Sequence, residues 1–579
     1  GALINKGHID LLTGRFENNS VTNAQYAQGG AIYNATNTHD EYAQTAELTI
    51  VDSVFANNFI DSADADWAEG GAIYNEPDSF VTFKGTNTFS GNTVNGVAND
   101  IYNDGTLTIA SGMTSIDGGI NGEGALDIQS DATLNMNYAS IEQGTINIDG
   151  TLMASLANAN DTVDISGIMS GSGDIVLTAA TTGTYDISVF NDFIADRDAD
   201  DVISFGKTYN VSIADGMATL TAKSASDIAS STGITNSAAG VISTFATSSD
   251  AKIQQVSLAI QEALNNGNTE LVEKELGKLN PDSKPVTQSV AASVQGQVLT
   301  VASGRMSSVG GGATGRAGGD VTSAGVWAQG LINKSKLNGH FDGHTRGFAL
   351  GADTLIDDVY TIGAGYAYNN TDIDTKDGDT SVESNSVFAY AQYKPANWYI
   401  NATMNYTMSE YTNETNLLGV LLDNNKYDAD AFGIQAMYGY DFASGITPEL
   451  GMRYLHVSQD AHQNVGGNMI AEMNTNFLSV VSGVNYAFNI ESDTEIKFSP
   501  SLRAAMTYDV ISENAIATVM VPGSSAYFVD VENLSRLGGE FGIGLTAEWR
   551  GLEMSLNYEL DLHEDYTSQT GLLKFRYDF

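Results

Sequence analysis

The chain has 579 residues, of which 71 are Asp or Glu and only 25 are Lys or Arg, so its formal net charge at pH 7 is −46. This excess of negative charge excludes a protein that binds nucleic acid by neutralising phosphates, and the absence of cysteine excludes disulfides and thiolate metal sites. Glycine is abundant (60 residues) and proline is scarce (7 residues), which favours tight turns between many short strands over disordered linkers.

Membrane-spanning helices are not predicted. The sequence contains no run of about 18 apolar residues, and residues 1–25 lack the charged and apolar regions of a secretory signal peptide. Transmembrane β-strands leave no such run, because they need only about ten residues of alternating hydropathy. The search for a membrane domain therefore has to look for strands.

Residues 1–225 consist of short repeats. The segment GGAIYN occurs at Gly29–Asn34 and at Gly70–Asn75, and the copies are followed by Phe-x-x-Asn segments at Phe55–Asn58 and Phe89–Asn92. Repeats with glycine turns, apolar alternation and Asn at fixed offsets are typical of a parallel β-helix. A shorter copy, GALIN, stands at Gly1–Asn5, and we expect the repeat array to continue upstream of it.

Each repeat position has a predicted role. Isoleucine and phenylalanine would stack as interior columns, and asparagine would occupy turns, where its side chain binds backbone groups and forms a ladder between rungs. Glycine would lie where no Cβ fits. The repeat residues to which we assign these structural roles are Gly30, Ile32, Asn34, Phe55, Asn58, Gly71, Ile73, Asn75, Phe89 and Asn92.

Residues 226–312 are predicted to be helical. Apolar residues recur at helical spacing over 251–279, Asp250 is a candidate N-cap, and Asn265–Asn266 is interpreted as a C-terminal cap before Gly267. The segment Val286–Met306 is also compatible with a helix and is rich in Ala, Ser and Val. A glycine-rich link follows it.

Residues 313–579 read as one strand after another. The twelve strand candidates are 323–334, 344–356, 359–371, 382–394, 397–410, 428–442, 446–458, 476–490, 494–510, 534–549, 551–563 and 568–579. In the last candidate Leu573, Phe575 and Tyr577 share one face, while Lys574 and Arg576 share the other. Short turns alternate with longer polar connections, of which the longest are 369–385 and 412–426.

This pattern predicts an antiparallel barrel of the outer-membrane type, with apolar residues facing lipid and polar residues facing the lumen. The alternative is a soluble β-sandwich or barrel. Alternation over twelve strands argues against it, because large apolar side chains would face water.

Several segments resemble the autotransporters, the type V secretion family. Strand-one residues "GVWAQGLINKSK" (Gly325–Lys336), the G-x-x-x-G-x-D pattern within Gly347–Asp372, the pre-barrel segment Leu279–Met306 and the ending "KFRYDF" carry this resemblance. The repeats resemble those of the polymorphic-membrane-protein type. Relative to the family's usual terminal signal, the apolar position is shifted, because Lys574 stands three residues after Gly571.

The resemblance implies an architecture and a function. It implies an all-β chain: a right-handed parallel β-helix passenger (1–225), an α-helical linker and barrel plug (226–312), and a 12-stranded transmembrane β-barrel (313–579). The barrel would anchor the chain in the bacterial outer membrane and help to display the passenger at the cell surface. The barrel-assembly signal would comprise Gly571, Phe575, Tyr577 and Phe579.

The implied partners are outer-membrane lipid and lipopolysaccharide, the barrel-assembly machinery, and a host or cell-surface ligand of the passenger; no nucleic acid is expected. Some family members cleave their passenger at an Asn in the plug, but Val286–Met306 contains no Asn. The plug therefore predicts an uncleaved passenger. The segment 160–225 would form the last rungs, and the helix at 251–279 would lie outside or near the pore mouth.

Catalytic and metal sites are not predicted. None of the seven His has metal-ligand spacing, and His340 and His344 are interpreted as surface loop residues. The acidic runs Asp61–Trp67, Asp196–Asp201 and Asp374–Thr380 do not match a calcium loop and are interpreted as solvated loops. We therefore expect no catalytic, cofactor-binding or metal residues.

Three functions compete at this stage. The first is a surface-display protein with an adhesive or stalk-like passenger, since a β-helix offers an extended binding surface. The second is a secretion barrel and stalk for an enzymatic passenger domain lying upstream. The third is a porin, which a plugged lumen disfavours.

Overall fold

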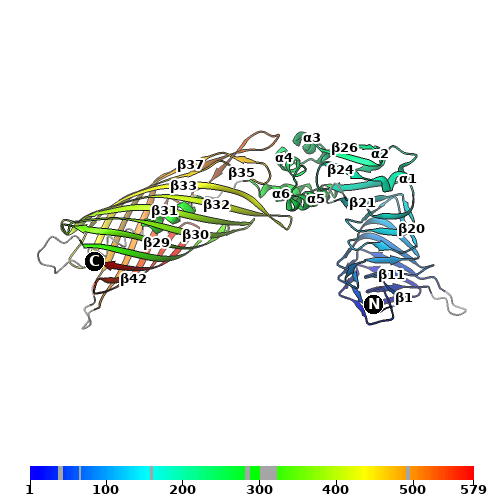
Figure 1. Ribbon diagram of the computed structural model, residues 1–579, viewed down its shortest axis with the longest axis horizontal. Coiled ribbons are helices and arrows are strands. Elements are labelled where there is room, and N and C mark those ends of the chain that lie inside the picture. The colour runs from blue at the N-terminus through cyan, green and yellow to red at the C-terminus, as the bar shows by residue number, and fades with distance from the viewer. Residues whose placement is uncertain are drawn as a thin grey trace. The chain divides into compact units, whose positions relative to one another are not determined.

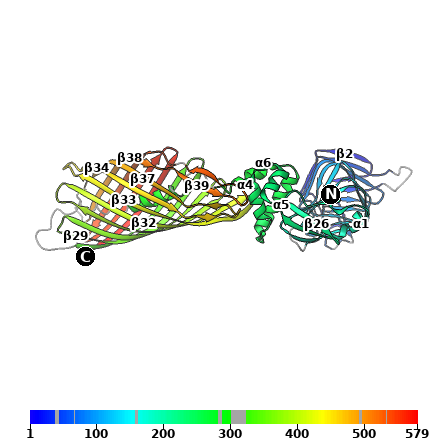
Figure 2. The same ribbon diagram turned by 90° about the horizontal axis from the view of Figure 1, so that it is seen from above.

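The computed structural model describes residues 1–36, 44–63, 65, 67–156, 161–280, 287, 289–299, 323–488, 490, 496–531 and 533–579. These residues form two compact units, Gly1–Glu273 and Lys274–Phe579 (Figures 1 and 2). The predicted boundary at 312–313 lies outside the described residues, and the boundary after 225 stays a prediction.

Three parallel ladders form the body of the N-terminal unit. The first ladder consists of β1 (Leu3–Asn5), β6 (Ile32–Asn34), β11 (Ile73–Asn75), β15 (Ile101–Asn103), β17 (Ile120–Asn121), β20 (Ile141–Ile148) and β22 (Ile165–Ser170). The second consists of β2 (His8–Leu12), β7 (Glu47–Val51), β12 (Phe80–Ser90), β16 (Thr106–Ser115) and β18 (Ala125–Ile128), and it also joins β20. The third consists of β3 (Arg15–Glu17), β8 (Val54–Ala56), the ends of β12 and β16, β19 (Ala132–Asn135), β21 (Thr151–Leu156), β23 (Asp174–Ala179) and β25 (Ile203–Ser204).

Two smaller sheets lie between the third ladder and the start of the next rung. One pairs β5 (Tyr26–Gln28) with β10 (Trp67–Glu69), and the other contains β4 (Ser20–Thr22), β9 (Phe59–Asp61), β13 (Thr93–Val94) and β14 (Val97–Ala98). Strands from successive repeats pair in parallel along each ladder, with register shifts in the β12–β16 and β20–β22 pairs, which is the arrangement of a β-helix. The parallel β-helix predicted from the repeats is therefore confirmed.

The C-terminal end of the β-helix differs from the prediction, which placed further rungs over residues 160–225. Only β22, β23 and β25 continue the parallel ladders. The segments β24 (Gly183–Asp186), β26 (Tyr209–Ala214) and β27 (Met217–Ala222) instead form an antiparallel sheet, accompanied by η1 (Ser188–Phe190), α1 (Asn191–Ile194) and α2 (Ala199–Val202). Such a cap covers the apolar end that a regular rung would leave in water.

Helices α3 (Ala225–Thr232), α4 (Asn236–Phe245), α5 (Ala251–Asn265) and α6 (Thr269–Gly277) follow. Asp250 caps α5 by accepting from the backbone N–H groups of Lys252 and Ile253, and the helix ends at Asn266 before Gly267, which has a φ of +76°. Both capping predictions are confirmed. The helix α5 packs within the N-terminal unit, where Thr208 donates a hydrogen bond to Gln261 (2.7 Å). Its expected position outside or near the pore mouth stays a prediction. Among the described helices, none combines the length and hydropathy that a membrane crossing requires.

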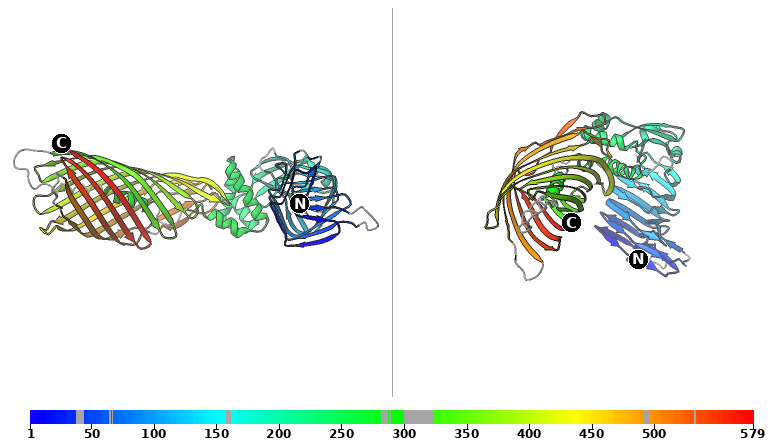
Figure 3. Two further views of the ribbon diagram at one scale, coloured as in Figure 1. Left: turned by 90° about the horizontal axis from the view of Figure 1, so that it is seen from below. Right: turned by 60° about the vertical axis from the view of Figure 1, so that its left-hand side comes forward.

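The C-terminal unit is a closed antiparallel barrel of twelve strands (Figure 3). Its strands are β28 (Ser323–Leu337), β29 (Phe341–Ile356), β30 (Tyr360–Thr375), β31 (Asp379–Tyr393), β32 (Trp398–Leu417), β33 (Val420–Tyr440), β34 (Ile446–Gln459), β37 (Met473–Ala487), β38 (Lys497–Ser512), β41 (Leu537–Trp549), β42 (Leu552–His563) and β43 (Tyr566–Asp578). β43 pairs with β28 and closes the barrel. The twelve-strand prediction is confirmed.

Two predicted polar connections are mostly strand. Pairing between β32 and β33 extends to Leu417 and Val420, and their hairpin turns at Leu418 and Gly419, whose φ values are 51° and 85°. The connection over 369–385 shrinks to residues 376–378 in the same way. The segment 369–385 is mostly polar and 412–426 is polar at both ends, so hydropathy gives little strand signal there, but backbone pairing in a ladder needs no apolar face.

Four short strands form a separate sheet that the sequence did not predict. They are β35 (His462–Gln463), β36 (Met469–Ile470), β39 (Ala515–Met520) and β40 (Tyr527–Val531). Ala515, Ala517 and Val531 pack against Met473, at the start of β37. His344 also departs from the prediction, because it lies exposed within β29 and not in a loop.

The two faces of the barrel wall differ in chemistry. On β32, Ile400 and Met404 are exposed, whereas Asn401, Thr403 and Asn405 between and beside them are buried toward the interior. The same alternation runs along β29 to β33. An apolar exterior around a polar interior is the arrangement that a lipid bilayer requires of a barrel.

Candidate functional site in the barrel lumen

A helix occupies the lumen of the barrel. Its described part covers residues 289–299, within the segment Val286–Met306 that was predicted to be the plug; residues 286, 288 and 300–306 lie outside the described residues. Figure 2 shows this helical segment behind the barrel strands. The helix, called here the lumenal helix, fills the space that would otherwise form a channel.

Apolar contacts hold the lumenal helix against the wall at two levels along the barrel strands. Val290 and Val294 belong to a buried cluster with Leu337, Phe341, Ile373, Val382, Tyr411, Ala429 and Tyr566. Val298 packs with Trp327 and Phe388 near the other end. Small residues dominate the remaining positions of the helix, so its backbone approaches the wall closely, as the predicted plug requires.

Polar contacts fix the position of the helix along the lumen. Gln295 Nε2 donates to the backbone carbonyl oxygen of Tyr454 (3.2 Å), and Thr287 Oγ1 lies 3.0 Å from the Tyr427 hydroxyl. On β33, Gly433 faces Gln295, and a Cβ at this position would overlap both Gln295 Nε2 and Asn405 Oδ1. The wall is therefore shaped to the helix at this glycine.

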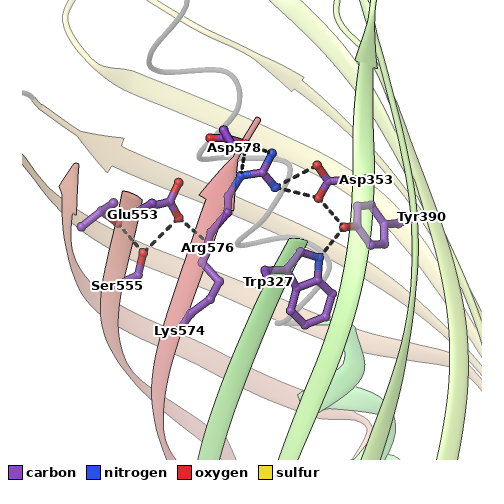
Figure 4. Close-up of polar contacts among 9 residues, drawn as sticks. Trp327, Asp353, Tyr390, Glu553, Ser555, Lys574, Arg576 and Asp578 are labelled. Atoms are coloured by element: carbon purple, nitrogen blue, oxygen red, sulfur yellow. Dashed lines mark hydrogen bonds and ion pairs between the residues drawn. The ribbon is translucent and has the colours of Figure 1, made fainter. Parts of the chain in front are cut away.

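A buried ionic network lies at the barrel seam, where the last strand β43 pairs with the first strand β28 (Figure 4). Arg576 Nη1 on β43 contacts both carboxylate oxygens of Asp353 on β29, at 2.8 and 2.9 Å, and Arg576 Nε donates to Asp578 (2.6 Å). Asp353 also accepts from the Tyr390 hydroxyl (2.7 Å), which in turn accepts from Trp327 Nε1 (3.0 Å). The network joins strands β28, β29, β31 and β43.

Two further ion pairs line the wall. Lys574 Nζ lies 2.8 Å from Glu553 Oε1, and both side chains are almost fully buried. The carboxylate of Glu540 forms ion pairs with Arg503 (2.7 Å) and Arg453 (3.0 Å). The predicted inward position of Lys574 and Arg576 is confirmed. These carboxylates are paired with guanidinium and ammonium groups of other barrel strands, so they tie the strands of the wall together.

The predicted repeat residues come together as stacked columns. Asn34 Nδ2 donates to Asn75 Oδ1 (2.7 Å) and Asn75 Nδ2 donates to Asn103 Oδ1 (2.7 Å). Their backbones are extended strand ends, so the predicted turn positions are wrong for these residues. A second row of side chains is formed by Asn58, which donates to Asn92 (2.9 Å), and by Asn92, which donates to Asp100 (2.8 Å).

The apolar and glycine positions also stack. The rings of Phe16, Phe55 and Phe89 lie parallel, with centroids 5.0 and 4.6 Å apart, and Ile73 pairs with Ile32 in the neighbouring strand. A Cβ on Gly30 would overlap the backbone oxygen of Gly71, and one on Gly71 would overlap that of Asn99. All these contacts bind rung to rung.

The proposed terminal signal residues lie on the last strand. Phe575 and Tyr577 are 46% and 54% exposed on the outer face of β43, and Phe579 is 71% exposed. Gly571 pairs with Ile332 of β28, and a Cβ at this glycine would make ordinary contact with the Ile332 side chain. Their role in barrel assembly stays a prediction.

The described part of the chain contains no group of three or more His, Cys, Asp or Glu that could hold a metal ion. Asp198, within the acidic run 196–201, caps α2 by accepting from the backbone of Asp200. Residues 64 and 66 of the acidic run 61–67 lie outside the described residues.

The comparison with family models decides the identity of the barrel. Residues 326–559, which cover β29 to β41 and most of β28 and β42, match the model of the autotransporter β-domain. The barrel is an autotransporter β-domain. Its barrel accordingly resides in the bacterial outer membrane.

Curated relatives of this autotransporter are outer membrane proteins of Rickettsia. Outer membrane protein B of Rickettsia typhi is 24% identical over 336 residues, which are 52% of this chain and 20% of the relative. Outer membrane protein A of Rickettsia conorii is 24% identical over 258 residues, or 41% of this chain and 13% of the relative. The chain thus spans about a fifth or less of the length of these relatives.

Solved structures similar to the autotransporter barrel include two translocator units. The translocator domain of NalP from Neisseria meningitidis has a TM-score of 0.39 and 18% identity, covering 51% of this chain and 98% of that chain. The transport unit of AIDA-I from Escherichia coli has a TM-score of 0.34 and 16% identity, covering 48% and 96%.

Sequence reasoning missed the partner of Arg576. Asp353 carries a signal, because it ends the G-x-x-x-G-x-D pattern and lies in the inward phase of its strand. The pairing itself has no local signal, since the two residues are 223 positions apart.

Proposed function

We propose that this autotransporter displays its β-helical unit at the cell surface as an uncleaved passenger with an adhesive or stalk-like role. The lumenal helix carries the proposal, because it runs through the barrel and connects in sequence to the β-helix. The predicted plug contains no Asn at which a family-type cleavage would occur. We also propose that the chain is not an enzyme; an enzymatic passenger lying upstream is the alternative.

The ladders support a role as a rigid scaffold. Each rung binds its neighbours through continuous backbone pairing, Asn ladders and aromatic stacks. Such a solenoid holds its outward side chains at fixed spacing, which suits binding of an extended or repetitive partner. A host or cell-surface ligand is the proposed partner of this surface.

Two further partners follow from the barrel. The exposed apolar belt of the wall fits outer-membrane lipid and lipopolysaccharide. The exposed aromatic residues at the end of β43 fit recognition by the barrel-assembly machinery, because they are presented outward on the strand that closes the barrel.

Expression behind a secretory signal peptide in a diderm host tests display. We expect one band near 61.2 kDa in outer-membrane fractions, and external protease should remove the β-helix from intact cells while sparing the barrel. Two membrane-derived bands without protease, or a β-helix resistant on intact cells and sensitive after lysis, would contradict the proposal.

Matched variants control for assembly. Phe579→Ala should lower the amount of folded barrel in the membrane if this residue belongs to the assembly signal. Phe348→Ala changes an aromatic that is 44% exposed on the same barrel and should leave that amount unchanged. Equal levels for both variants would contradict the proposed signal.

A further inference from the structure

One outward face of the β-helix combines exposed aromatic rings with carboxylates. On the paired strands β5 and β10, Tyr26 and Trp67 lie side by side, with ring centroids 5.6 Å apart and planes tilted by 52°. Their side chains are 57% and 60% exposed. Aromatic rings this large are usually covered in a folded protein, so a pair left open to water is a candidate contact surface.

The same face continues with polar groups. Gln28 and Glu69 follow two residues after Tyr26 and Trp67, so they project from the same side of the two strands, and Gln28 Nε2 lies 3.4 Å from Glu69 Oε2. The exposed ring pair therefore has an amide and a carboxylate beside it.

A column of three tyrosines borders this pair of strands. The rings of Tyr33, Tyr74 and Tyr102 stack at 5.5 and 5.6 Å with nearly parallel planes, and the Tyr33 hydroxyl donates to Glu76 (3.3 Å). Burial, together with the nearby carboxylates of Glu69 and Asp104, raises the pKa of Tyr102 to about 12. Glu69 thus stands between the ring pair and the tyrosine column.

Positive charge is scarce around this face. From Gly1 to residue 160 the only basic residues besides histidine are Lys6, Arg15 and Lys84. Within the described part of the chain, no ion pair engages Glu69, Glu76, Asp104 or Glu123, which all act on the tyrosine column. The face is therefore an array of π-rings and carboxylates without a basic side chain to neutralise it.

We infer that this aromatic–carboxylate face, formed by the exposed rings of Tyr26 and Trp67 with Glu69 beside them, binds arginine or lysine side chains of a basic protein partner, and that the stacked column Tyr33–Tyr74–Tyr102 borders it. A cation is attracted to the face of an aromatic ring by the ring quadrupole, most strongly for Trp, and carboxylates at the edge add charge complementarity. The two rings lie on paired strands with centroids 5.6 Å apart, so they offer adjacent contacts to one extended basic segment. This inference rests on the proposed surface display, because only a displayed β-helix meets such a partner.

Binding is measured with the purified full chain in uncharged detergent micelles at physiological ionic strength. The probe is a fluorescein-labelled peptide of alternating arginine and glycine, and its control is the same peptide with citrulline, which keeps the shape of arginine without the charge. We expect the arginine peptide to bind and the citrulline peptide to bind far more weakly. Equal binding of both peptides would overturn the inference and favour a neutral ligand such as a sugar.

Substitutions separate this face from the general attraction of an acidic protein. Trp67→Leu removes the π-face but keeps apolar area, and we expect it to weaken arginine-peptide binding about two- to fivefold. Trp67→Phe keeps an aromatic ring and should bind nearly as the parent does. Ile168→Leu, at a residue 72% exposed elsewhere on the unit, is the matched surface control. If Trp67→Leu binds like Trp67→Phe and the parent, the inference is wrong.

The carboxylate and the display are tested separately. Glu69→Gln should weaken binding and reduce its dependence on salt; an unchanged salt dependence counts against the face. Intact cells are then stained with the same arginine peptide. Binding to the purified chain without staining of cells rejects surface display, whereas a protease-accessible β-helix that does not bind the peptide rejects the inference alone.

Discussion

Arg576 on the last barrel strand reaches across the first strand to Asp353 on the second, and its Nη1 lies within 2.9 Å of both carboxylate oxygens. β43 pairs with β28, and β28 pairs with β29, so this contact spans the seam at which the barrel closes. Both side chains are at most 3% exposed. The ion pair therefore connects the two ends of the barrel sheet through side chains that are buried from bulk water.

Removing one partner of this pair should destabilise the barrel. Arg576→Met takes away the guanidinium from a buried carboxylate, and we expect a loss of about 3–5 kcal/mol in the free energy of unfolding. The double variant Arg576→Met/Asp353→Leu should lose less than the single variant, since no buried charge is left unmatched. Heat-dependent mobility of the barrel in gels measures the effect.

The exposed pair of Lys336 and Asp342 provides the control. Their side chains are 51% and 45% exposed at an N···O distance of 3.4 Å, so Lys336→Met should change stability by less than about 1 kcal/mol. A double variant at the seam that is as unstable as Arg576→Met would show that the pair does not act through charge.

Enlarging Gly433 should displace the lumenal helix. A Cβ there overlaps Gln295 Nε2, so we expect Gly433→Val to loosen the helix and to raise ion conductance in planar bilayers above that of the parent barrel. Shortening the partner in Gly433→Val/Gln295→Ala should restore part of the block. Gly330→Val, at a glycine with free space around it, should conduct like the parent.

The first Asn ladder should be sensitive to a single deletion. Asn75 is fully buried, accepts from Asn34 and donates to Asn103, so Asn75→Ala leaves two buried amides without their partner. We expect a loss of about 1–3 kcal/mol for each unsatisfied group. Chemical denaturation followed by circular dichroism tests this, with the exposed Asn210→Ala as control. Equal stability of both variants would show that the Asn ladder does not stabilise the β-helix.

Stability of the β-helix should fall as pH rises toward the raised pKa of Asp100. Burial raises the pKa of Asp100 to about 6, despite hydrogen bonds from Asn92, Asp117 and Gly118. The folded state therefore holds a proton that the unfolded state releases near pH 4, so the folded state loses about 2–3 kcal/mol between pH 4 and pH 6.5 from this group.

Unfolding of the parent and Asp100→Asn across this pH range separates that group from the other carboxylates. The free energy of unfolding of Asp100→Asn should fall less steeply with pH, and the difference in slope should correspond to about one bound proton. Asp117→Asn removes a neighbouring charge that helps to raise the pKa of Asp100, so its decline should lie between those of the parent and Asp100→Asn. Parallel curves for the parent and Asp100→Asn would contradict a raised pKa.

Local repetition made much of the fold readable from the sequence. The spacing of GGAIYN and Phe-x-x-Asn predicted which residues stack, because each rung repeats the same local geometry and neighbouring rungs must match. Alternation in the C-terminal part predicted twelve strands, since a lipid-facing residue and a lumen-facing residue must follow each other along each strand. The absence of Asn from the plug segment was likewise a property of the sequence.

Long-range matching could be decided only by the tertiary structure. The hairpin at Leu418–Gly419, the small sheet containing β39 and β40, and the antiparallel cap at β26 and β27 depend on backbone pairing that hydropathy does not encode. Contacts such as Arg576 with Asp353, or Gln295 beside Gly433, require distant segments to meet at fixed register. Sequence alone thus determined the repeating units and their faces, because those follow from neighbouring residues. Barrel closure and the position of the lumenal helix were decided by the tertiary structure, because they follow from how whole strands are arranged around one another.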